Sequence, residues 1–234
     1  MAIHFHILSA SGALTGPVRE KLDKALAETA SLCGALLNLA DVDVVVMNQP
    51  RNVIPRIGTN GWSHGAHEVT LNLDVGHEYL QSHFASSVSA VLAHELHHCA
   101  RAHALGSSHG RSYGEKLVAE GLACCFEEEI GEPTPFYAVE CKDDALRRFS
   151  AKAKARLENE RDGLENPWND WMSGNDWMFG RASDDPEFPY QCGYSTGYAL
   201  VRRWVDATGS TPSSSAGVEA SEIVGMWLNG RLQP

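Results

Sequence analysis

The chain has 234 residues, 43% of them apolar, and 19 basic against 30 acidic side chains give it a formal net charge of −11. This length fits one globular domain, and the apolar content suffices for a core, which excludes a disordered chain. An acidic surface repels phosphate backbones and so argues against a nucleic-acid partner. The N-terminus lacks the pattern of a secretion signal, and no window approaches the roughly 18 apolar residues of a membrane helix. We therefore expect a cytoplasmic protein without a membrane partner.

The six cysteines are irregularly spaced and include the adjacent pair Cys124-Cys125. Such spacing is unlike a disulfide framework or a structural zinc knuckle. It predicts free, buried thiols in a reducing compartment.

The first third of the chain alternates between strand and helix patterns. Alternating residues over 3–8 predict a strand, and the helical spacing after Pro17 predicts a helix to about Leu39. Residues 43–47 predict a strand with a buried centre, and 48–66, rich in Pro, Gly and Asn, a loop lining a cleft. Residues 69–73 predict a half-buried strand at a sheet edge.

The remainder is mainly helical. Helices are predicted over about 82–104, 112–131, 142–165, 193–207 and 217–229, and the third of these is charged and expected to be exposed. The stretch 166–192 is predicted to form an aromatic lid or pocket wall, because a loop with so many aromatic residues must pack on something. Its aromatic residues include Trp168, Trp171, Trp177, Phe179 and Tyr190. The fold class is α+β, with more helix than strand.

The pentapeptide His94-Glu95-Leu96-His97-His98 indicates a metal site. Residues four apart project from one face of a helix, so His94 and His98 can bind one tetrahedral zinc ion. Glu95, beside the first histidine, can accept a proton from water. The apolar run 90–93 leads directly into the motif and favours a packed helix over a surface helix with incidental histidines.

A third ligand is predicted in the next helix. Glu120 shares a helical face with Tyr113, Leu117 and Cys124. A carboxylate in such an apolar stripe needs a partner, because an unpaired buried charge is costly. Zinc is one such partner, and a salt bridge to an arginine is the alternative.

These residues resemble a known class of enzymes. The pentapeptide, followed after twenty-one residues by Glu120-Gly121-Leu122-Ala123, resembles the gluzincin class of zinc metallopeptidases. More narrowly, the chain is similar to the YjaZ-like family of predicted Zn-dependent proteases. The resemblance extends over about 69–203 and includes the segment 193–198, Gly-Tyr-Ser-Thr-Gly-Tyr.

The resemblance implies that His94, His98 and Glu120 bind one zinc ion per chain and that Glu95 is the catalytic base. It also implies a zincin-like fold, in which a small mixed sheet packs on the helix of the pentapeptide. Residues 1–234 would form one metallopeptidase domain. Its sheet and active-site helices would cover about 1–131, and a helical lobe with the aromatic lid about 132–234.

Other zinc classes fit the spacing less well. An extended metzincin motif needs a glycine at 101 and a histidine at 104, where the chain has Arg101 and Ala104. His103 misses that position by one residue. His109, in the Gly/Ser linker, remains open as an alternative ligand.

The sequence does not identify the group that orients His94. Position 124, one turn after Glu120, is a cysteine where a carboxylate often supports the first histidine. The acidic run 127–129 is interpreted as a solvated helix end.

A tyrosine is expected to assist the reaction. The oxyanion formed during peptide hydrolysis needs a hydrogen-bond donor, and enzymes of the class that the chain resembles often use a tyrosine or histidine of the helical lobe. Tyr194 and Tyr198 lie one turn apart on a predicted helix. We predict Tyr194 in this role; that both tyrosines merely pack between helices is the alternative.

The predicted function is hydrolysis of a peptide or protein substrate by zinc-activated water. Glu95 would take the proton of the water and deliver it to the leaving amine. The strand over 69–73 could hold an extended peptide by backbone pairing. One alternative is a zinc-stabilised binding or chaperone-like protein, against which Glu95 and the three-ligand count argue. The other is a hydrolase of a non-peptide amide or ester.

Overall fold

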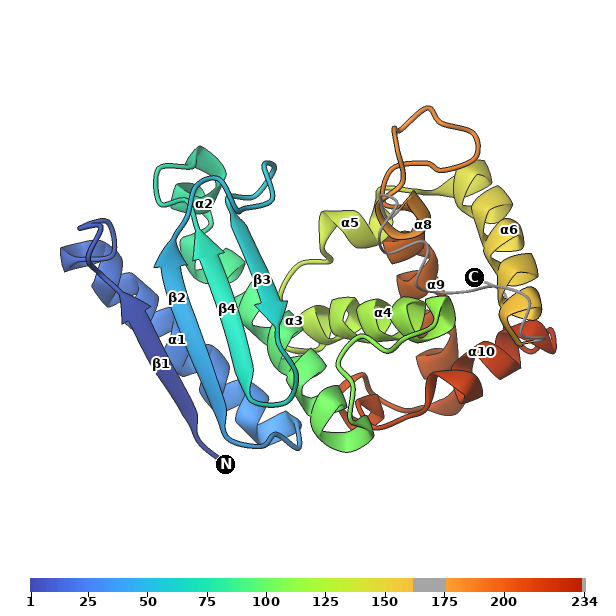
Figure 1. Cartoon of the computed structure of the whole chain (residues 1–234), viewed down its shortest axis with the longest axis horizontal. Helices are drawn as coiled ribbons and strands as arrows, with labels where there is room; N and C mark the ends of the chain where they lie inside the picture. Colours follow the sequence, from blue (N-terminus) through green and yellow to red (C-terminus); the bar gives the residue numbers. More distant parts are fainter. Residues whose placement is uncertain (162–175, 233–234) are drawn as a thin grey trace. The chain divides into compact units, whose positions relative to one another are not determined.

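The computed structural model describes residues 1–161 and 176–232, which are drawn as ribbon in Figure 1. The chain divides into two compact units. Unit 1 consists of Met1–Ser108 and Phe126–Glu132, and unit 2 of His109–Cys125 and Pro133–Pro234. Helix α4 (Tyr113–Glu129) is continuous and contributes residues to both units.

Unit 1 is built on a four-stranded mixed sheet with the strand order β1-β2-β4-β3. Strands β1 (Ile3–Leu8), β2 (Val42–Asn48) and β4 (Glu68–Leu73) are parallel, and β3 (Thr59–Ser63) pairs antiparallel with β4. The central strands supply fully buried apolar side chains, as predicted for β2. These are Val42, Val44, Val46, Val69, Leu71 and Leu73.

Two predictions for this sheet are wrong. The stretch 48–66, predicted as a loop, contains β3, and the predicted edge strand over 69–73 is β4, which lies between β2 and β3. Strand β3 has the sequence Thr-Asn-Gly-Trp-Ser, and glycine and asparagine are depleted in strands. It forms because it completes a backbone ladder with β4, from Thr59 opposite Leu73 to Ser63 opposite Val69.

Three helices complete most of unit 1. Helix α1 (Gly16–Leu36) has a proline in its first turn, as predicted, and ends three residues before the predicted Leu39. A short helix α2 (Glu78–Ser82) precedes α3 (Phe84–Leu105), the predicted helix of the pentapeptide. Helix α3 packs beside α1 and contacts β3 and β4, behind the sheet in the view of Figure 1.

Unit 2 is helical. It contains the first turns of α4 and the helices α5 (Phe136–Val139), α6 (Asp143–Arg161), α8 (Asp176–Phe179), α9 (Cys192–Thr208) and α10 (Ala220–Leu228), with a 3₁₀ turn at Ser213–Ser215. The prediction of an exposed helix over 142–165 is wrong for one face of α6. On that face Phe149, Ala153 and Leu157 are buried in the apolar core of the unit.

Ser112 and Glu115 form a capping box at the beginning of α4. The backbone N–H of Glu115 donates to Ser112 Oγ at 3.2 Å, and the backbone N–H of Ser112 donates to Glu115 Oε2 at 2.8 Å. Further along, α4 and α9 approach so closely that a Cβ on Gly121 would overlap the carbonyl oxygen of Gly197. This contact fixes the backbone of α4 next to Glu120.

Part of the predicted aromatic lid belongs to the core of unit 2. Trp177 packs on Phe149 and Phe188, with ring centroids 5.8 and 5.3 Å away. Trp168 and Trp171 lie outside the described residues.

All six cysteines are free and buried, as predicted. Among the described residues, no helix is both long enough and apolar enough to span a lipid bilayer.

Candidate metal centre

The pentapeptide lies in the buried second half of α3, where His94, Glu95 and His98 are 7%, 6% and 1% exposed. The rings of His94 and His98 meet edge to face, with their centroids 4.8 Å apart. This is the geometry that a separation of four residues gives on a helix. The structure therefore brings the two predicted histidines together on one buried face.

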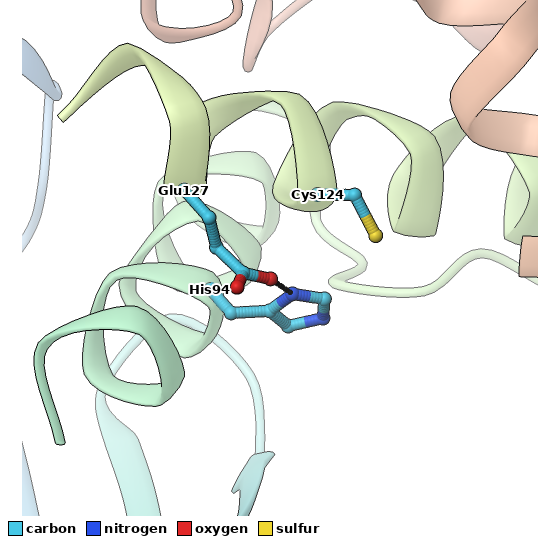
Figure 2. A group of neighbouring side chains, drawn as sticks. All are labelled: His94, Cys124 and Glu127. Carbon is cyan, nitrogen blue, oxygen red and sulfur yellow. Dashed lines mark hydrogen bonds and ion pairs between the residues drawn. The ribbon is translucent and has the colours of Figure 1, made fainter. Parts of the chain in front are cut away.

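His94 has an orienting partner that was not predicted from the sequence. Its Nδ1 lies 2.8 Å from Oε1 of Glu127, and the Glu127 side chain is 2% exposed (Figure 2). The interpretation of Glu127 as part of a solvated helix end is therefore wrong. An ionised carboxylate only accepts hydrogen bonds, so the ring hydrogen of a neutral His94 is on Nδ1. Nε2 then keeps its lone pair for a metal ion.

The position of Glu127 on helix α4 explains how it comes to pair with His94. Glu127 follows Glu120 by seven residues, which is two turns of one helix, so both carboxylates lie on the same face. The stripe predicted around Glu120, continued by one more turn, would have reached Glu127. The adjacent acidic residues Glu128 and Glu129 concealed that periodicity.

The predicted ligand atoms are close to one another. One nitrogen each from His94 and His98 and a carboxylate oxygen of Glu120 all lie within 4.8 Å of one another, and Glu120 is 7% exposed. A second group with the same property consists of His94, Cys124 and Glu127. The alternative ligand His109 has its Nε2 3.8 Å from Oε1 of Glu120.

The side chain of Glu95 lies directly against strand β3. A Cβ added to Gly61 would stand 2.5 Å from Cγ and 2.7 Å from Oε1 of Glu95. Since real Cβ atoms do not approach so closely, only glycine at 61 leaves the Glu95 side chain in its place. This contact could not be predicted from the sequence, because it depends on strand β3, which the composition of residues 59–63 does not indicate.

Tyr194 is half-buried in an aromatic group of unit 2. Its ring centroid lies 5.2 Å from that of Tyr137 and 5.5 Å from that of Phe179. These two ring contacts restrict the rotation of the Tyr194 ring.

The Glu127 contact gives a first prediction. In Glu127→Ala we expect zinc affinity to fall by roughly 10–100-fold, because the imidazole loses the group that fixes its tautomer and orientation. Competition with a chromophoric chelator measures the change. Glu128→Ala, at the next and more exposed position, is the control and should bind zinc like the wild type. Equal affinities in the two variants would show that Glu127 does not orient a metal ligand.

The chain belongs to a protein family described as predicted Zn-dependent protease (DUF2268), whose model matches residues 22–225. The match includes helices α3 and α4 with all the residues of the candidate centre. It confirms, at the level of the family, the resemblance found in the sequence. No curated protein and no solved structure matches the chain.

Proposed function

We propose that this chain is a zinc-dependent peptidase with a zincin-like arrangement, in which His94, His98 and Glu120 hold the metal ion. The observation that carries the proposal is the hydrogen bond between His94 Nδ1 and Glu127. A buried carboxylate that binds one ring nitrogen and leaves the other for a metal ion is the usual environment of a zinc-binding histidine. The family description supports the metal and the class of reaction.

The donor set fits zinc. Two imidazoles and one carboxylate are ligands that zinc accepts in tetrahedral sites, and three protein ligands are the number found in catalytic rather than structural sites. When bound, zinc supplies a Lewis acid that polarises a carbonyl group and makes water more acidic. The four-stranded sheet with the pentapeptide on the adjoining helix α3 supports the zincin-like assignment.

Glu95 is the proposed general base. It follows His94 on α3, and the proposed ligand set does not use its carboxylate. It would take the proton of the attacking water and return it to the leaving amine. The contact with Gly61 restricts the positions that its side chain can occupy.

Strand β3, rather than β4, is the proposed binding edge for an extended peptide. The carbonyl oxygen of Gly58 accepts a hydrogen bond from the N–H of Asp74, and the N–H of His64 donates one to the carbonyl oxygen of Glu68. At these two positions the backbone groups therefore point toward β4. In an antiparallel ladder the orientation alternates, so Gly61 and Ser63 direct their backbone groups away from β4. A peptide added there would pass the side chain of Glu95 and pair through its main chain.

Tyr194 is the proposed donor to the oxyanion. Its packing against Tyr137 and Phe179 supports the role only in that it limits rotation of the ring.

Cleavage of an unfolded protein substrate by the purified chain tests the proposed function. We expect new amino termini to accumulate, the activity to disappear when a chelator removes the metal, and stoichiometric zinc to restore it. Zinc bound at full occupancy without cleavage of any peptide would contradict the proposal. That result would favour the zinc-stabilised binding protein.

A further inference from the structure

Cys124 lies beside the proposed zinc centre, and the function described above does not use it. It is fully buried and precedes Glu127 by three residues on the same helix. Its sulfur, a nitrogen of His94 and a carboxylate oxygen of Glu127 all lie within 4.8 Å of one another. Figure 2 shows the side chains of Cys124 and Glu127 projecting from α4 toward the His94 ring.

This group differs from the proposed zinc ligands in its chemistry. A thiolate is a soft ligand and an imidazole a borderline one, so a set of sulfur, nitrogen and oxygen favours a thiophilic ion more strongly than two nitrogens and an oxygen do. Among the described residues, no other cysteine belongs to such a group of potential ligands.

The two ligand sets share His94, and they cannot both be filled by a neutral imidazole, because it offers a lone pair on only one ring nitrogen. In the proposed zinc centre Glu127 holds the hydrogen of Nδ1, so that Nε2 faces the metal. An ion bound to Glu127 and Cys124 would instead take Nδ1, with the ring hydrogen on Nε2 and the thiol proton released to solvent. Binding at the second set therefore removes both a ligand and its orienting group from the first.

We propose that His94, Cys124 and Glu127 form a second metal site, selective for thiophilic divalent ions such as Cd²⁺, whose occupation displaces zinc and inhibits the protein. Binding at this site does not require Glu120 or His98. Only the displacement of zinc and the inhibition rest on the proposed function.

Titration of the purified full-length protein with Cd²⁺ alone tests this proposal. We expect a thiolate-to-cadmium charge-transfer band in the ultraviolet that saturates near one equivalent, together with release of bound zinc to an indicator dye. The band should be lost in Cys124→Ala and in Cys124→Ser. It should persist in Cys125→Ala, which removes the neighbouring and equally buried thiol from the apolar core of unit 2.

Other outcomes separate the two proposals. A band that is absent from the wild type, or unchanged in both Cys124 variants, would overturn the second site. Glu120→Ala is expected to lose zinc and still develop the band, because Glu120 belongs only to the first set. Loss of the band in Glu120→Ala would also count against a separate site. A wild-type band in a protein that cleaves no peptide would support the second site while refuting the peptidase function.

Discussion

Replacement of Glu95 by glutamine is expected to lower the rate of peptide cleavage by about 10²–10⁴-fold, the usual contribution of a general base. The amide has nearly the same shape as the carboxylate but does not accept a proton from water. Because Glu95 is not in the proposed ligand set, zinc content should be unchanged. Initial rates at saturating substrate and elemental analysis of the same preparation measure both quantities.

Gly61→Ala tests the position of the Glu95 side chain through its contact with strand β3. The added methyl group would meet the Glu95 side chain at 2.5 Å, so the carboxylate has to move and the rate should fall while zinc stays bound. Gly225→Ala is the matched control, because a Cβ there meets nothing within 4 Å. Full activity in Glu95→Gln would exclude Glu95 as the base, and full activity in Gly61→Ala would show that the contact is not needed.

Much of the fold could be predicted because its patterns are local. The alternation in β1 and β2, the proline at the start of α1 and the capping box of α4 each mark an element without reference to the rest of the chain. Strand β3 could not be predicted in this way. Its residues disfavour a strand, and it is stabilised by backbone pairing with β4, which the composition of the segment does not indicate.

In the candidate metal centre, too, some features follow from local sequence and others only from the tertiary structure. The spacing of His94 and His98 on one helix is a local property, and the structure has the two rings in contact. Their partners come from other elements, and only the tertiary structure shows that Glu127 pairs with His94 and that Gly61 lies on Glu95. A charged run at the end of a helix usually faces solvent, so the sequence predicts an exposed Glu127, whereas the structure buries it.

Removal of a proposed zinc ligand should have the largest effect on metal binding. His94→Ala and Glu120→Ala each leave two protein ligands, one fewer than the three that a catalytic zinc site uses. The loss of affinity should exceed the roughly 10–100-fold expected when only an orienting group is removed. His103→Ala is the control, since His103 lies on the same helix α3 but is exposed.

The zinc content of purified wild-type, His94→Ala, Glu120→Ala and His103→Ala proteins, measured by elemental analysis, tests the central claim most directly. We predict about one zinc ion per chain in the wild type and in His103→Ala, as expected for a single three-ligand site, and none retained by the other two variants after dialysis. Undiminished zinc in Glu120→Ala would contradict the proposed ligand set and make His109 the next candidate. A wild-type protein that binds no zinc, even when it is supplied, would contradict the metallopeptidase account as a whole.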